Sequence, residues 1–281
     1  MSSFALTLVL SAAVLHASWN ALVKAAPDRA LTIAAIALVN AVAGLALILF
    51  SGVPASASWP MIAASTLLHY LYYTFMYQAY RLGDLSHVYP ISRGMAPALV
   101  ALGTFLLIGE VLPPLGLAGL AAVTLGIGVL AFQRGAAFAD RQTLVAAGLL
   151  GLTIAAYSVA DGIGVRWSEN PMAYMGWLFL LESPVVIAVL WMRRRNGTQF
   201  DPRTFGIGLI GGLVSVTAYG VVLYAKTIAP IGAVSAVRES SVIIAALIGV
   251  IIFGERPWKG RILAALIVAV GVIMLAFSGS H

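Results

Sequence analysis

Residues 93–132 and 238–277 decide the fold of this chain. The first stretch reads RGMAPALVALGTFLLIGEVLPPLGLAGLAAVTLGIGVLAF and the second reads RESSVIIAALIGVIIFGERPWKGRILAALIVAVGVIMLAF. They align without a gap at a shift of 145 positions, and ten of the forty positions are identical. Apolar composition inflates such matches, but it does not explain why Arg93 falls on Arg238 or why a Gly-Glu pair recurs at 109–110 and 254–255. The sequence therefore predicts an internal repeat.

The composition around these stretches predicts an integral membrane protein. Of the 281 residues, 61% are hydrophobic and 9% are charged, and the mean hydropathy is +1.00. Soluble domains carry roughly 25% charged residues, so these charges are too few to cover a soluble protein of 29.4 kDa. The absence of cysteine excludes a disulfide scaffold. The net charge of +6 is spread between apolar runs rather than gathered on one face, so no nucleic-acid partner is expected.

Apolar runs of membrane-spanning length recur along the whole chain. A bilayer core needs about 20 apolar residues per helix, and ten segments meet this length within a few residues. The predicted spans are residues 4–23, 31–50, 59–80, 88–108, 112–132, 143–163, 173–192, 205–225, 231–253 and 260–277. The short connections leave no room for a soluble domain. No basic segment precedes the first run, which contains His16, so we interpret it as a retained span rather than a signal peptide.

The repeat and the spans together predict an all-α architecture of ten transmembrane helices around a central cavity. Five spans fall in residues 1–137 and five in residues 138–281. Because each half has an odd number of spans, the second half must enter the membrane upside down. Inverted repeats of this kind build transporters with a site near the middle of the bilayer.

Polar side chains within the predicted spans are the candidates for that site, since they are costly in lipid and usually face the interior. Helical spacing places several of them on shared faces. The candidate substrate-binding residues are His16, Trp19, Asn20, His69, Tyr72, Tyr73, Met76, Tyr89, Arg93, Trp177, Glu182, Ser235 and Arg238.

Structural roles compete with binding at these positions. His69 could be an interhelical hydrogen-bonding residue, and each arginine could be neutralised by a carboxylate, which Glu239 offers directly beside Arg238. The two Gly-Glu pairs are interpreted as structural turns at helix ends. Glu182 has the least comfortable structural explanation, because a lone carboxylate in mid-span should be protonated, paired or hydrated.

The mixture of rings, imidazoles, hydroxyls and guanidinium groups suits a small organic solute with an apolar body and a carboxylate or amine. An ion pathway would need mainly oxygen ligands, and carboxylates are scarce here. Arg93 has no acidic neighbour in its own span, so we expect it to hold a substrate carboxylate and to pair with Glu182 when the site is empty. Inversion of the repeat is expected to place Arg93 and Arg238 on opposite sides of the cavity.

The chain resembles the drug/metabolite transporter superfamily, EamA-type. The resemblance is carried by the ten spans in two repeats, the run HASWNALVK from His16 to Lys24, and the Gly-Glu pair after the fourth and ninth spans. Within that family the aromatic interior is similar to that of amino-acid exporters, including exporters of aromatic amino acids. The resemblance implies a basket-shaped bundle with a central cavity and alternating access, and it supplies no diagnostic substrate residue.

The expected function is therefore export of amino acids and related small metabolites from a bacterial cell across its inner membrane. Export of drugs, toxic compounds or other metabolites is the alternative. An intramembrane enzyme or a membrane scaffold is more remote, because no Gly-x-Ser-x-Gly or His-Glu-x-x-His motif occurs. No cofactor or metal is expected, the partners are the solute and membrane lipid, and a monomer is possible.

The charges of the connections predict the orientation of the chain. The connections after even-numbered spans hold only Arg166 and Lys226, whereas those after odd-numbered spans hold twelve basic residues. The twelve are Lys24, Arg29, Arg81, Arg134, Arg141, Arg193, Arg194, Arg195, Arg203, Arg256, Lys259 and Arg261. The positive-inside rule then places both termini outside, although ten-span relatives are commonly drawn with both termini inside.

Overall fold

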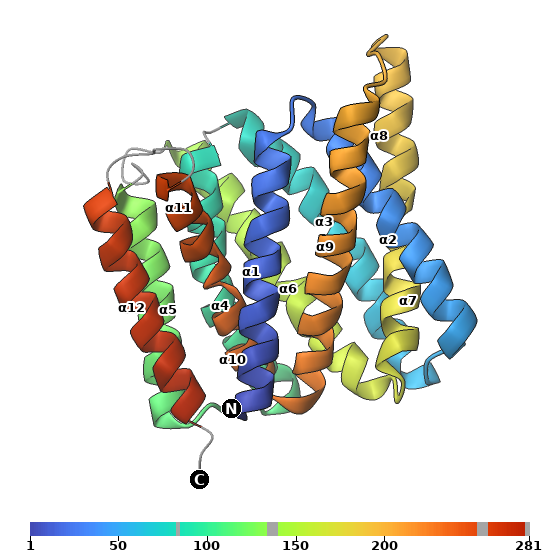
Figure 1. Cartoon of the computed structure of the whole chain (residues 1–281). Coiled ribbons are helices and arrows are strands. Elements are labelled where there is room, and N and C mark those ends of the chain that lie inside the picture. Colours follow the sequence, from blue (N-terminus) through green and yellow to red (C-terminus); the bar gives the residue numbers. More distant parts are fainter. Residues whose placement is uncertain (83–84, 134–139, 252–257, 279–281) are drawn as a thin grey trace.

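The computed structural model describes residues 1–82, 85–133, 140–251 and 258–278, and in these segments the chain is helical with no strand. Figure 1 shows the helices as a bundle. The elements are α1 Ser3–Ala25, α2 Arg29–Ser51, the 3₁₀ turn η1 Ser56–Ser58, α3 Trp59–Leu82, α4 Leu85–Ile108, α5 Pro114–Gln133, α6 Arg141–Trp167, α7 Pro171–Glu182, α8 Pro184–Arg195, α9 Pro202–Ile228, α10 Ile231–Arg238, α11 Ser241–Ile251 and α12 Trp258–Phe277. The predicted all-α class is confirmed. The predicted boundary between the halves, at residues 137 and 138, lies outside the described residues.

The outer surface of the bundle is suited to lipid. Among the described residues, eight helical segments are long and apolar enough to cross a membrane, with α7 and α8 counted as one. Large apolar side chains such as Leu49, Phe50 and Ile187 are 72–92% exposed on the outside. Of the ten predicted spans, the third and the ninth do not meet the same criterion. The third is rich in tyrosine and contains His69, and the ninth is interrupted.

Two of the predicted spans are not continuous helices, which corrects the sequence-based prediction. The span predicted at 173–192 is divided where α7 ends at Glu182 and α8 begins at Pro184. Proline has no amide hydrogen to continue the helix. The amide and the hydroxyl of Ser183 instead donate to the Leu180 carbonyl, at 3.1 and 2.6 Å. The span predicted at 231–253 is divided between α10 and α11, at Glu239 and Ser240.

Acidic N-caps fix where several helices begin. The carboxylate of Asp140 accepts a hydrogen bond from the backbone amide of Thr143 at 2.7 Å, and this bond lowers the pKa of Asp140. Asp201 caps α9 through Thr204 in the same way. Asp28 caps α2 through the amide of Leu31 and also accepts from Arg193 at the end of α8. The α1–α2 connection is therefore tied to the α8–α9 connection.

Helices α5 and α12 pack closely enough to require glycine. A Cβ atom added at Gly119 would lie 2.7 Å from the Gly271 carbonyl oxygen, and one added at Gly271 would lie 2.7 Å from the Gly119 carbonyl oxygen. Gly126 faces Ala264 and Val268 in the same manner. Positions that increase along α5 thus meet positions that decrease along α12, so the two helices run antiparallel.

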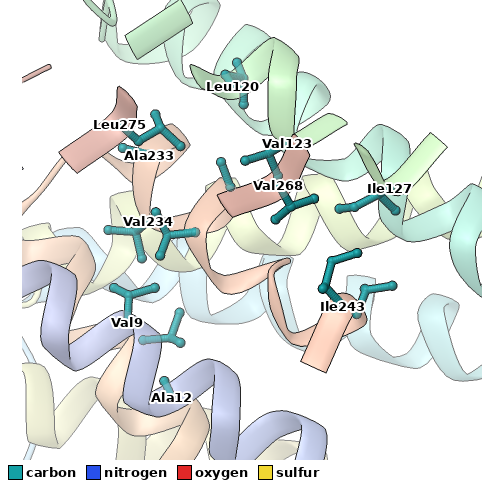
Figure 2. Close-up of a cluster of buried hydrophobic side chains, with 14 of the residues drawn as sticks. Val9, Ala12, Leu120, Val123, Ile127, Ala233, Val234, Ile243, Val268 and Leu275 are labelled. Atoms are coloured by element: carbon teal, nitrogen blue, oxygen red, sulfur yellow. The ribbon is translucent and has the colours of Figure 1, made fainter. Parts of the chain in front are cut away.

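The same interface contributes to the largest group of buried apolar side chains. Val123 and Val268, which correspond under the shift of 145, are both fully or almost fully buried there. Figure 2 shows these two side chains close together, with Ile127 and Leu275 nearby. Val234 of α10 and Val9 of α1 belong to the same cluster, which therefore joins the α5–α12 pair to the centre of the bundle.

The two ends of the bundle differ in their chain connections. The N-terminus and the end of α12 lie at one end of the bundle, and the α1–α2 and α8–α9 connections lie at the other (Figure 1). Arg193, Arg194 and Arg195 end α8 and Arg203 lies in the first turn of α9, so these basic side chains lie at the end of the bundle opposite the N-terminus.

Candidate functional site

A buried carboxylate at the break between α10 and α11 binds two guanidinium groups. Glu239 is 1% exposed, and its Oε1 accepts from Nη2 of Arg238 at 2.7 Å. The same oxygen accepts from Nη1 of Arg93 at 3.0 Å, and Oε2 lies 3.3 Å from that nitrogen. Arg93 reaches Glu239 from α4, which packs beside α10.

This arrangement corrects two expectations about the arginines. Arg93 pairs with Glu239 and not with Glu182. Arg93 and Arg238 share one carboxylate instead of lying on opposite sides of a cavity. Glu239 lies at the break after Arg238 and α10 packs beside α4, so this one carboxylate is within reach of both guanidinium groups.

His16 lies on the other side of Arg93 and receives more donors than it can accept. Nη2 of Arg93 is 2.9 Å from Nε2 of His16, and the indole Nε1 of Trp19 is 3.2 Å from Nδ1. Guanidinium and indole nitrogens only donate, and a neutral imidazole has a single acceptor nitrogen. The neutral His16 ring can therefore accept from only one of these two groups at a time. The side-chain amide of Asn20 is engaged with the His16 carbonyl at 2.7 Å.

Further donors at the break have no partner among the described residues. They are the hydroxyl groups of Ser235, Ser240 and Ser241 and Nε of Arg238. Their side chains belong to residues that are 1–8% exposed, so solvent does not satisfy them directly. The break therefore collects buried hydrogen-bonding groups around a single carboxylate, Glu239.

A second polar group surrounds His69 on α3. Its Nδ1 lies 3.1 Å from Oε1 of Glu182 and 2.9 Å from the Ser65 carbonyl oxygen. The ring stacks on Tyr157 of α6, with centroids 4.1 Å apart and planes inclined by 29°. The contact with Glu182 of α7 agrees with the interhelical role predicted for His69, while its hydrogen bond to the Ser65 carbonyl lies within α3 and its role in substrate binding stays a prediction.

A third buried group joins α6, α7 and α9. Asp161 accepts hydrogen bonds from Tyr174 at 3.0 Å and from Tyr219. Nζ of Lys226 is fully buried and donates to the Ser158 carbonyl oxygen at 2.8 Å. Sequence reasoning treated Lys226 as a charge of a connecting loop, and this is wrong: Lys226 lies inside α9.

The aromatic candidates do not all lie together. Tyr72 contacts Tyr73 and Tyr157 at centroid distances of 5.4 and 5.8 Å, and Met76 packs against the same apolar cluster as Tyr72. Trp177 lies apart from them. Its indole donates to the Gly52 carbonyl at 3.2 Å and meets Trp59 edge-on, at the end of α2 and the start of α3. The side chain of Tyr89 lies outside the described residues.

The first Gly-Glu pair has structural contacts. Gly109 ends α4 with φ of +65°. Glu110 accepts from Arg166 of α6 at 2.9 Å and from the Gly232 amide of α10 at 3.2 Å. It therefore ties the end of α4 to two other helices. The second pair, at 254–255, lies outside the described residues.

The polar centre is closed in this structure. Arg93 is 5% and Glu239 is 1% exposed. A pocket of about 250 Å³ lies at the end of the bundle that holds the N-terminus, lined by residues that include Met1, Pro113 and Pro230. The residues around Glu239 do not line it. Arg93 and Glu239 are therefore both shielded from bulk solvent in this structure.

Comparison with known proteins identifies the second half of the chain. Residues 142–277 match the EamA-like transporter family. This segment belongs to that family. The match confirms the resemblance to the drug/metabolite transporter superfamily, and it includes α9, α10, Arg238 and Glu239. The membrane-spanning helices and this match together indicate a multi-pass membrane protein.

The fold as a whole is shared with a solved structure. That structure, titled "Crystal structure of protein", is similar over 98% of this chain and 96% of its own, with a TM-score of 0.75 and 18% identity. At this identity the likeness concerns the fold alone. No curated protein matches the chain. The functional conclusion therefore rests on the match of residues 142–277 to the EamA-like transporter family and on the geometry of the polar centre.

Proposed function

We propose that this chain exports amino acids, including aromatic ones, and related small metabolites across a bacterial inner membrane by alternating access. The observation that carries the proposal is the excess of donors at the break between α10 and α11. Arg93 and Arg238 bind one carboxylate there, and Nε of Arg238 and the hydroxyls of Ser235, Ser240 and Ser241 are buried without a partner among the described residues. A buried donor without an acceptor costs free energy, so the centre is suited to a ligand that brings acceptors.

A carboxylate is the ligand that fits these donors best. A guanidinium presents a planar fork that matches two carboxylate oxygens. The unpartnered hydroxyls of Ser240 and Ser241 lie at the start of α11, where a helix N-terminus favours negative charge. Broken helices with such ends are a recurring way to bind substrates in transporters.

The remainder of an amino acid finds complementary groups nearby. Tyr157, stacked on His69, and Tyr72 provide aromatic surface for an apolar side chain. Glu239 could accept a hydrogen bond from a substrate ammonium once Arg93 and Arg238 turn to the substrate carboxylate. The carboxylate and the ammonium of the substrate would thereby replace the contacts that Arg93, Arg238 and Glu239 make with one another in this structure.

The helix packing supports ten spans in two inverted five-helix repeats. Gly126 and Gly271 correspond under the shift of 145, and each packs against the equivalent part of the opposite helix. A two-fold axis that exchanges the antiparallel helices α5 and α12 must be perpendicular to both helices. An inverted repeat requires an axis in this direction. Likewise α1 packs on α9 as α6 packs on α3. Alternating access follows if the two halves rock about this axis.

Counterflow into proteoliposomes tests the proposal. Vesicles loaded with unlabelled L-phenylalanine should take up labelled phenylalanine, tryptophan and tyrosine in a saturable manner. Phenethylamine, which lacks only the carboxylate of phenylalanine, should compete poorly because it offers no acceptor to the arginines. Exchange of lipophilic cationic drugs without exchange of any amino acid would instead identify a drug exporter and refute the proposal.

A further inference from the structure

Glu182 and His69 form a buried pair that the donor argument above does not use. The two residues are 8% and 6% exposed and come from α7 and α3. Their closest atoms, Oε1 and Nδ1, are 3.1 Å apart. Glu182 is the last residue of α7, directly before the break at Ser183 and Pro184.

The hydrogen bonds around the pair leave Oε1 of Glu182 able to bind one proton. Nδ1 of His69 lies 2.9 Å from the Ser65 carbonyl oxygen and 3.2 Å from the Ser65 hydroxyl oxygen, and because the carbonyl can only accept, the tautomer with its hydrogen on Nδ1 satisfies the shorter of these two contacts. That hydrogen is directed within α3 and not toward Glu182. Oε1 of Glu182 has accordingly no hydrogen-bond partner in the described part of the chain. A buried carboxylate oxygen without a donor is costly, and a bound proton removes that cost.

The groups that face Glu182 do not neutralise it permanently. No arginine or lysine forms an ion pair with it among the described residues, and His69 is its one ion-pairing neighbour there. The facing titratable groups are His69, Tyr70 and Tyr73 on α3, Tyr157 and Asp161 on α6, Tyr174 on α7 itself, and Tyr219 on α9. Helix α2, which also packs on α7, carries only Arg29, at its first position.

The pair lies next to the α7–α8 break and is linked through Tyr157 to the region of Arg93 and Arg238. The hydroxyl of Tyr70 on α3 donates to the Leu181 carbonyl at 2.5 Å, next to the α7–α8 break. The ring of His69 stacks on Tyr157. Arg238 and Arg93 lie close enough to Tyr157 for their positive charges to act on its hydroxyl group. A change of charge at Glu182 therefore alters the electrostatic field at the α7–α8 break on one side and near Arg93 and Arg238 on the other.

We propose that Glu182, with His69, binds and releases one proton in each transport cycle and so couples transport to a pH gradient. The proton enters from water and forms an O–H bond on the Glu182 carboxylate. The same bond breaks when the proton leaves to water on the opposite side, and no electrons are transferred. The coupling rests on the proposed transport function, whereas the proton site itself does not.

Infrared difference spectroscopy tests the proton site without any substrate. Purified protein in liposomes is titrated, and the C=O stretch of a protonated carboxylic acid is followed. The band should disappear in Glu182→Gln, shift in frequency in Glu182→Asp, and persist in Glu169→Gln, which makes the same change at an exposed carboxylate outside the helices. A band that is unchanged in both Glu182 variants overturns the proposal.

Transport under an imposed pH gradient tests the coupling. At one proton per substrate, a gradient of one pH unit should drive about a tenfold substrate gradient. The direction of the pH gradient that drives accumulation tells whether proton and substrate cross together or in exchange. Glu182→Gln should lose this accumulation but keep counterflow at equal pH, which also shows that it folds. Accumulation by Glu182→Gln equal to that of the parent overturns the coupling. If the parent exchanges no amino acid, the proposed function fails while the infrared result still decides the proton site.

Discussion

Substitution of Gly119 by alanine should weaken the α5–α12 interface. The new Cβ would lie 2.7 Å from the Gly271 carbonyl oxygen and 3.0 Å from both the amide nitrogen and Cγ of Leu275. The backbone atoms of α12 cannot move aside individually, so the helices must separate by about half an ångström. A gap of this order forfeits about a quarter or more of the attraction between the facing atoms. Overpacking of this kind costs about 1–3 kcal/mol.

Gly128→Ala is the matched control, because it lies on the same helix and its added Cβ would meet nothing within 4 Å. Thermal unfolding of the purified protein in detergent should show Gly119→Ala melting below Gly128→Ala, by about 2–4 °C per kcal/mol. Gly271→Ala should behave like Gly119→Ala. The double variant should cost less than the sum, because one separation of the helices relieves both contacts. Equal melting of Gly119→Ala and Gly128→Ala would refute the close approach.

Three further predictions concern transport and topology. Arg93→Lys should fold but exchange amino acids poorly, because a point charge replaces the planar fork; counterflow beside Arg194→Lys measures this, and parent-like exchange would make Arg93 structural. Trp19→Ala and Tyr73→Ala should impair transport of large apolar amino acids more than small ones, by about 1–3 kcal/mol of lost ring contact, and an equal loss for all substrates would indicate a packing role. A periplasmic reporter should be active at the C-terminus and inactive after Arg195, whereas the reverse would invert the orientation.

The helices were predictable because the bilayer imposes a length and an apolar composition that any window can detect. The break at Ser183 had a signal in Pro184, which cannot continue a helix. The break at Glu239 had none, since no proline or glycine interrupts the sequence from Val234 to Ile244.

The pairing of the charged groups depended on information that the sequence does not hold. Arg93 meets Glu239 because α4 and α10 lie side by side, and the two residues are 146 positions apart. Lys226 lies four residues before Pro230, at the end of its apolar run, and this position in the sequence predicts a charge in a loop. Only the packing of α9 on α6 shows that its ammonium is buried against the Ser158 carbonyl.

The unequal shape of the two related arginine helices has a consequence for the cycle. In the second half the chain breaks after Arg238, whereas in the first half α4 runs straight through the corresponding pair, Arg93 and Gly94. If the halves trade conformations when access changes sides, α4 should kink at Gly94 as α10 and α11 straighten. Pro97 weakens α4 at that position, because it has no amide hydrogen to donate to the Arg93 carbonyl. The opposite-facing state would then present Arg93, and no longer Arg238, at an unwound turn.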